Sequence, residues 1–174
     1  MTAKRLYAHG MESLYVLCVV ISGLALVAIT LIIPFGVFMR YVMNNPQSWP
    51  EPAAVVMMVL FSFVGGAAVY RANVHIAVES LTQAVSPAWR GAMAHLVQVL
   101  MAVMGLFMVI YGLELCHITW HQSMPEFPGL PVGLVYGPIP LGGALTLLFL
   151  FEKVWVGPVP RTSFMFSDEA VDLE

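Results

Sequence analysis

Histidine and cysteine are the residues of this sequence whose chemistry could hold a metal ion or a haem. His117 and His121 are four residues apart and could share one helix face, but no carboxylate or thiolate accompanies them, so interfacial hydrogen bonding is the simpler interpretation. His95 is the one histidine inside an apolar stretch, and a membrane haem held by two imidazoles needs a second. Cys18 and Cys116 lie about a hundred residues apart, without a CxxC pair. The sequence therefore predicts no cofactor and no metal site.

No set of residues in the sequence resembles a catalytic site. No nucleophile, base and orienting group converge, and the glycines are spread through apolar stretches and do not form a phosphate-binding loop. The run Gly65-Gly66-Ala67-Ala68 provides a small-residue face against which another helix could pack closely, and Gly142-Gly143-Ala144 provides a second. Packing within the chain and packing against another subunit are equally compatible with these faces. We predict a protein that is not an enzyme.

The composition indicates lipid as the main solvent of the folded chain. Of 174 residues, 60% are hydrophobic and 10% are charged, whereas about 25% are charged in an ordinary soluble domain. The net charge of -3 and the scattered basic residues exclude a phosphate-binding stripe, so nucleic acid is not an expected partner.

Four uncharged stretches between residues 12–40, 51–71, 90–114 and 126–152 are each about 19 residues or longer. A helix needs about 20 mostly apolar residues to cross a bilayer. The sequence thus predicts an all-α integral membrane protein, one membrane domain over residues 1–174 with spans at about 14–39, 51–70, 90–114 and 131–155. The first stretch has no clear small-residue cleavage site, so we interpret it as a retained span.

The basic residues predict the orientation of these spans, because positively charged loops stay in the cytoplasm. Four spans place both termini on the same side of the membrane. Only Arg40 lies on the opposite side. The side of the termini carries all the other basic residues: Lys4, Arg5, Arg71, Arg90, Lys153 and Arg161. We therefore expect cytoplasmic N and C termini.

Local signals predict where several helices begin. Ser48-Trp49-Pro50-Glu51 is typical of a capping box, with Ser48 as N-cap and Glu51 reaching back to its N–H. Ser86 followed by Pro87 is typical of an N-cap and first helical position. Residues 71–86 show apolar positions at helical spacing and predict an amphipathic cytoplasmic connector between the second and third spans.

Prolines predict an irregular fourth span. Pro131, Pro138 and Pro140 each remove a backbone donor, so we expect a short helical turn at about 131–136, a break, and a main helix over 138–155. Residues 157–174 begin with Gly157 and Pro158 and end in an acidic run, which predicts a disordered tail.

The charged residues that border the spans are expected at the membrane surfaces. Their long side chains can reach water or headgroups from positions near the span ends: Glu12, Arg40, Glu51, Arg71, Glu114 and Glu152. Arg40 and Glu51 could pair at the outer surface, where an exposed ion pair contributes only about 0–1 kcal/mol.

Several short segments, in order and at matching spacing, together resemble one known family over nearly the whole chain. They are Phe38-Met39-Arg40-Tyr41, Ser48-Trp49-Pro50-Glu51, Gly65-Gly66-Ala67-Ala68 with Arg71 and His75-Ile76, and Tyr136-Gly137-Pro138-Ile139-Pro140. The sequence resembles the small membrane subunit, or DctQ-type component, of tripartite ATP-independent periplasmic (TRAP) transporters. It departs from the family pattern at Pro52, where a second acidic residue is common.

The resemblance implies a scaffold in the bacterial inner membrane. Its partners would be a large multi-span permease subunit, a periplasmic solute-binding protein and membrane lipid, in sodium-driven uptake of an organic acid such as a C4-dicarboxylate or sialic acid. Residues of the matching segments become candidates for subunit contacts or structural roles: Arg40, Trp49, Glu51, Gly65, Gly66, Arg71, His75, Tyr136 and Pro140. A haem-binding or other anchor subunit of a membrane redox complex is the alternative.

Overall fold

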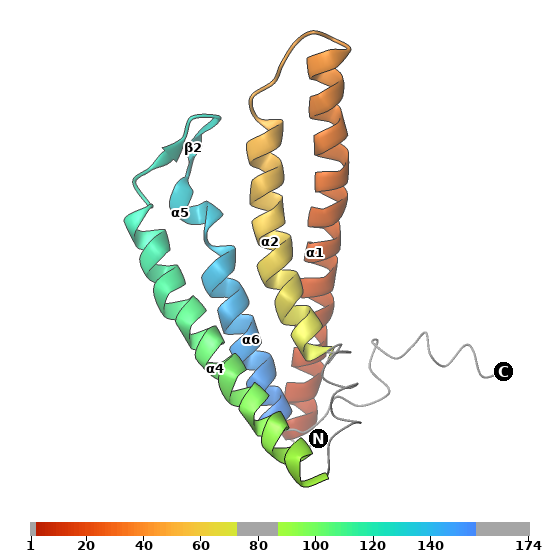
Figure 1. The fold of residues 1–174 in the computed structure, drawn as a ribbon, viewed down its shortest axis with the longest axis vertical. Coiled ribbons are helices and arrows are strands. Elements are labelled where there is room, and N and C mark those ends of the chain that lie inside the picture. The colour runs from red at the N-terminus through yellow and green to blue at the C-terminus, as the bar shows by residue number, and fades with distance from the viewer. Residues whose placement is uncertain (1–2, 73–86, 156–174) are drawn as a thin grey trace, which may run out of the picture.

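The computed structural model describes residues 3–72 and 87–155, which form long helices and one small hairpin (Figure 1). The elements are α1 (Ala3–Tyr41), α2 (Pro50–Arg71), α4 (Pro87–Ile118), β1 (Ser123–Met124), β2 (Phe127–Pro131), α5 (Val132–Val135) and α6 (Pro138–Trp155). Four helical segments of the described chain are long and apolar enough to cross a membrane. The predicted all-α membrane class with four transmembrane helices is confirmed. Residues 73–86 and 157–174, where a connector and a tail were predicted, lie outside the described residues, and so does Ser86.

The predicted capping box before α2 is wrong. The residue in the N-cap position is Trp49, and it makes no side-chain hydrogen bond to the helix. The helix begins at Pro50, one residue later than a Ser48 cap requires, although the Trp49 φ of -81° and ψ of -25° are close to helical values. The Glu51 carboxylate, which the capping box would direct toward Ser48, lies instead beside Arg40 of α1.

The fourth span is divided into a short helix, α5, and a long helix, α6. The N–H groups of Tyr136 and Gly137 donate to the carbonyls of Val132 and Leu134, which closes α5. Because Pro138 has no N–H, the hydrogen-bond ladder stops there and α6 begins afresh. The hairpin β1–β2, a two-stranded antiparallel pair with Met124 opposite Phe127, was not among the predicted elements.

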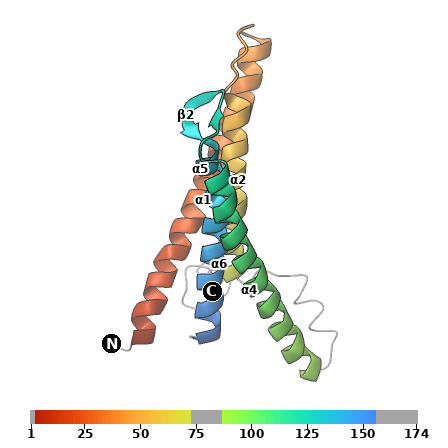
Figure 2. The same cartoon turned by 90° about the vertical axis from the view of Figure 1, so that its left-hand side faces the viewer.

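The four long helices lie in a row and do not form a closed bundle. α1 packs along α2, α2 along α6, and α6 along α4. Figure 2 shows α1 and α4 diverging toward the end that carries the N-terminus, with α6 between them. The hairpin and α5 lie at the opposite end (Figure 1). A row leaves two broad faces that the described residues do not cover.

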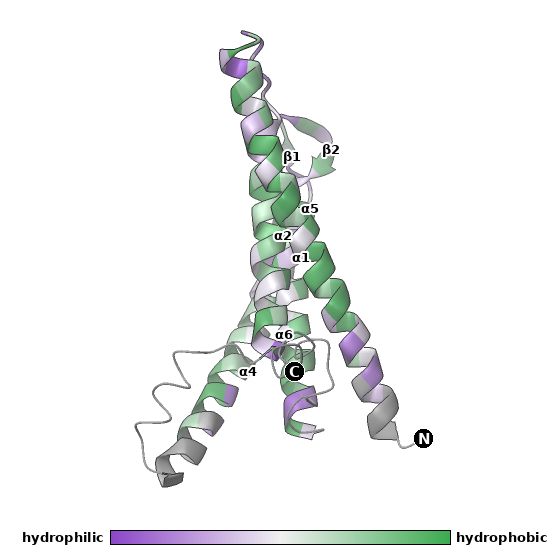
Figure 3. Cartoon of the chain, turned by 90° about the vertical axis from the view of Figure 1, so that its right-hand side faces the viewer, coloured by the Kyte–Doolittle hydropathy of each residue, from purple (hydrophilic) through white to green (hydrophobic). Residues whose placement is uncertain are grey.

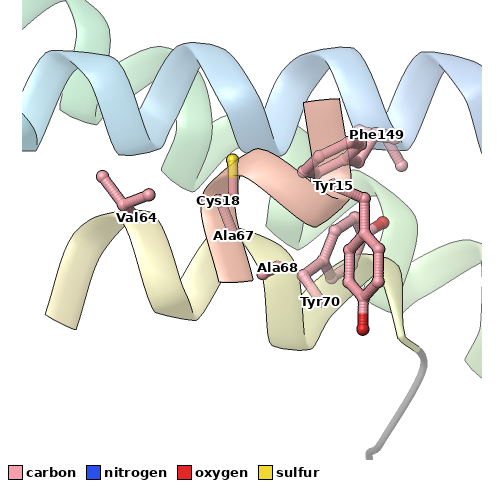
Figure 4. Close-up of a cluster of buried hydrophobic side chains, with 8 residues drawn as sticks. Tyr15, Cys18, Val64, Ala67, Ala68, Tyr70 and Phe149 are labelled. Carbon is pink, nitrogen blue, oxygen red and sulfur yellow. The ribbon is translucent and has the colours of Figure 1, made fainter. Parts of the chain in front are cut away.

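The core lies where α1, α2 and α6 meet. Figure 4 shows Tyr15 and Cys18 of α1 against Val64, Ala67, Ala68 and Tyr70 of α2 and Phe149 of α6. Outside this cluster many large apolar side chains are exposed along every long helix. Figure 3 shows hydrophobic residues along most of each helix and strongly hydrophilic residues mainly toward the helix ends, the distribution expected of a protein surrounded by lipid.

Glycines allow α6 to approach its two neighbours at backbone distance. A Cβ added at Gly142 would lie 2.7 Å from the carbonyl oxygen of Phe63 in α2. A Cβ at Gly143 would lie 2.9 Å from the carbonyl oxygen of Gly105 in α4. The small-residue face of the fourth span therefore serves packing within the chain.

We expect Gly142→Ala to destabilise the protein by about 1–3 kcal/mol, because the new methyl group meets backbone that can yield only if α2 and α6 separate. The matched control is Gly66→Ala, where an added Cβ meets no atom within 4 Å. Since alanine is the better helix former, the control should leave stability unchanged or raise it by up to about 1 kcal/mol. Melting temperatures in mild detergent measure both effects. Equal melting temperatures for the two variants would contradict the close approach of α2 and α6.

Candidate functional site

A buried charge cluster joins three helices at one end of the row. Arg71 is the last residue of α2. Its Nε donates to Glu152 Oε2 at 2.7 Å and its Nη2 donates to Glu152 Oε1 at 2.9 Å, a bidentate pair with α6. Its Nη1 donates to Glu12 Oε2 of α1 at 2.8 Å. One guanidinium group therefore connects α1, α2 and α6.

The cluster is largely shielded from solvent. The exposed fraction of the side chain is 3% for Arg71, 6% for Glu152 and 27% for Glu12. The guanidinium carbon lies 5.2 Å from the centre of the Tyr15 ring and 5.6 Å from that of Phe149. A planar guanidinium group suits this place because it forms a fork with one carboxylate, keeps a donor for a second and stacks on aromatic rings.

The expectation that charged side chains near the span ends reach water or headgroups is wrong for Arg71 and Glu152, whose side chains are buried. The predicted topology already placed Glu12, Arg71 and Glu152 on the same side of the membrane, and their charges are complementary. The shared side of the membrane and the complementary charges were the features of the sequence from which the cluster could have been predicted. What the sequence could not show is that α1, α2 and α6 converge there, because this depends on packing between helices.

At the other end of the row, Arg40 and Glu51 form an exposed pair. Arg40 Nη1 lies 3.4 Å from Glu51 Oε1, and 52% and 81% of the respective side chains are exposed. Trp49 packs beside Phe35, with ring centres 5.8 Å apart. This end of α1 and α2 thus carries a weak ion pair and interfacial aromatic residues.

A groove of about 430 Å³ runs between α1 and α2 on one face of the row. Small residues of both helices line much of it: Ser22, Gly23, Ser62, Gly65, Gly66 and Ala68. The two neighbouring glycines differ, because a Cβ at Gly65 would lie 3.2 Å from Ser22 Oγ, whereas one at Gly66 would meet nothing within 4 Å. Among the described residues, Ser22 Oγ has no hydrogen-bond partner although only 6% of the residue is exposed.

The remaining candidate residues are distributed along the chain. Tyr136 closes α5, and its carbonyl accepts from the N–H of Ile139 at 3.0 Å. Pro140 is buried, and a Cβ added at Gly112 of α4 would lie 2.9 Å from Pro140 Cδ. His75 lies outside the described residues. Tyr136 and Pro140 therefore shape the junction of α5, α6 and α4.

The residues considered for metal or haem chemistry do not come together in the described part of the chain. His95, His117 and His121 are exposed along α4 and the turn after it. No group of three histidine, cysteine, aspartate or glutamate side chains within residues 3–72 and 87–155 could hold a metal ion. Cys18 and Cys116 are free thiols on different helices.

Comparison with known families gives a match over most of the chain. A family described as tripartite ATP-independent periplasmic transporters, DctQ component, matches residues 29–157. A search of curated proteins found no match. The matched range includes Arg40, Glu51, Arg71 and Glu152, whereas Glu12 precedes it.

We expect Arg71→Ala to destabilise the protein by about 3–5 kcal/mol, because two carboxylates would be left without the cation that compensates them. Arg40→Ala is the matched control and should cost no more than about 1 kcal/mol, since it removes an exposed pair. Melting temperatures in mild detergent report both losses.

A neutral cluster separates the effect of charge from the effect of lost packing. Arg71→Met combined with Glu12→Gln and Glu152→Gln should be more stable than Arg71→Ala alone, because no buried charge then lacks a partner. If the single variant melted at the wild-type temperature, the cluster would have no structural role.

Proposed function

The chain belongs to the DctQ component family of the TRAP transporters, and on that premise we propose that it is the small scaffold subunit that supports the large permease subunit in the membrane. The family consists of transporter components rather than enzymes. The proposed complex takes up an organic acid, such as a C4-dicarboxylate or sialic acid, with the sodium gradient as driving force. A periplasmic solute-binding protein delivers the solute.

The observation that carries the scaffold role is the open row of helices. Transporters that bind solute at the bilayer midplane use interrupted helices with convergent polar groups. In the described residues the break between α5 and α6 lies beside the hairpin at one end of the row, and the buried charge cluster lies at the other end. The uncovered faces instead suit a chain that presents a fixed surface to a larger membrane protein.

The groove between α1 and α2 is the part of that surface best suited to a partner helix. Glycine costs about 1 kcal/mol relative to alanine inside a helix. Gly23 and Gly66 both line the groove, and neither is needed for packing within the chain, because an added Cβ meets no atom within 4 Å at either position. Small residues let the backbone of another helix approach closely.

We propose an inner-membrane location with both termini in the cytoplasm. The distribution of lysine and arginine supports this orientation. Arg71 and Lys153 end α2 and α6 at the end of the row that carries the N-terminus, whereas Arg40 ends α1 at the other (Figure 1). In this orientation the charge cluster fixes α1, α2 and α6 near the cytoplasmic surface, while Arg40, Trp49 and Glu51 face the periplasm.

Purification from native membranes tests the proposed function. The tagged chain, extracted in mild detergent, should recover one large multi-span protein in stoichiometric amount, and deletion of this chain should abolish sodium-dependent uptake of one class of organic acid. Competition among unlabelled C4-dicarboxylates and sialic acids then identifies the substrate class. Recovery of this chain alone, with unchanged uptake after deletion, would contradict the proposal.

We expect Gly66→Leu to reduce recovery of the large subunit about tenfold or more, because the leucine side chain occupies the space that a partner helix would use. Gly10→Leu is the matched control: its Cβ also meets no atom within 4 Å, but it lies outside the groove. The melting temperature of each isolated variant should stay near that of the wild type. Equal recovery with both variants would show that the groove is not the contact surface.

A further inference from the structure

A small pocket opens between the end of α1 and the start of α2, beside the exposed ion pair. Its volume is about 90 Å³, which corresponds to roughly three water molecules and suits one small polar group. Ile33 and Val37 form its apolar side, and Arg40, Tyr41, Gln47 and Glu51 form its polar side. The pocket therefore changes from apolar to charged along the direction of α1.

The pocket lies at the depth of lipid headgroups. From Arg71 to Glu51, α2 rises about 30 Å at 1.5 Å per residue, which is about the thickness of the hydrocarbon layer. Trp49 and Tyr41 are at the same level, and these residue types are enriched at membrane interfaces. Val37 and Ile33 lie about one and two turns of helix before Arg40, toward the hydrocarbon.

The ion pair on the rim can bind another molecule. Arg40 and Glu51 are 3.4 Å apart and largely exposed, so their mutual attraction is weak and each keeps hydrogen-bonding capacity. Arg40 and Glu51 are the charged residues that line the pocket. A lining with one cation and one carboxylate favours a ligand that carries both a negative and a positive charge.

We propose that this pocket binds the headgroup of a zwitterionic phospholipid with a primary amine, the chemistry of phosphatidylethanolamine. The Arg40 guanidinium binds the phosphate, and the Glu51 carboxylate accepts hydrogen bonds from the ammonium group. Two carbons join these groups in the lipid, so both can reach a pair of side chains that already lie together. The acyl chains continue past Val37 and Ile33. This inference does not rest on the proposed transport function.

The same chemistry distinguishes related lipids. Phosphatidylglycerol supplies the phosphate but no cation for Glu51. Phosphatidylcholine supplies a quaternary ammonium group, which has no N–H to donate and is bulkier than the pocket suits. The pocket should therefore rank phosphatidylethanolamine above both.

Native mass spectrometry of the purified full chain, titrated with each of the three phospholipids, tests the proposal. Wild-type protein should bind phosphatidylethanolamine about tenfold more tightly than the other two lipids. Glu51→Gln should remove this preference, and Arg40→Gln should weaken binding of all three, because each contains the phosphate. Equal binding of the three lipids by the wild type, or a preference for phosphatidylcholine, would overturn the proposal.

Glu114→Gln is the matched control, since it makes the same change at an exposed glutamate outside the pocket. It should keep the wild-type preference, and a loss equal to that of Glu51→Gln would overturn the proposal. Melting temperatures without added lipid check that each variant is folded. If Glu51→Gln did not fold, the ranking of the three lipids by the wild type would still decide the question.

Discussion

The structure depends on one guanidinium group held in an almost dry environment. Arg71 bonds to Glu152 with two of its donors and to Glu12 with a third, so α1, α2 and α6 must all end or pass at the same place. Buried ion pairs are weak evidence of net stability, because desolvation offsets much of the attraction. Their contribution here is geometric: of the possible arrangements of these three helices, few place both carboxylates within reach of one arginine.

This constraint at one end is consistent with an open arrangement elsewhere. Apolar side chains gain little by leaving lipid for another apolar surface, so helices in a membrane need close backbone contact or polar bonds to stay together. The chain uses both, with the charge cluster near the core and the glycines of α6 against α2 and α4. In the described residues, no comparable charge cluster or close glycine contact joins α1 to α4. The row therefore keeps its two uncovered faces.

Much of this architecture follows from the sequence, because hydrophobic length and proline position act locally. The long uncharged stretches predict the four helices, and Pro138 predicts the break before α6. Interactions between helices were harder to predict from the sequence. The pairing of Arg71 with Glu12 and Glu152 needs a relative orientation that no local pattern contains. The predicted Ser48 cap is wrong for a similar reason, because the Glu51 carboxylate lies beside Arg40 of another helix. Gly65 and Gly66 look equivalent in sequence, but only the first packs against Ser22.

We propose that another membrane protein covers the groove between α1 and α2. Photo-crosslinking in native membranes tests it directly, with a photoreactive residue at Ser62 in the groove and, as reference, at the exposed Val103 of α4. We expect the Ser62 probe to form an abundant adduct with one large multi-span protein, and the Val103 probe to form much less of it. Adducts of Ser62 with lipid alone, or equal adducts at both positions, would contradict the claim.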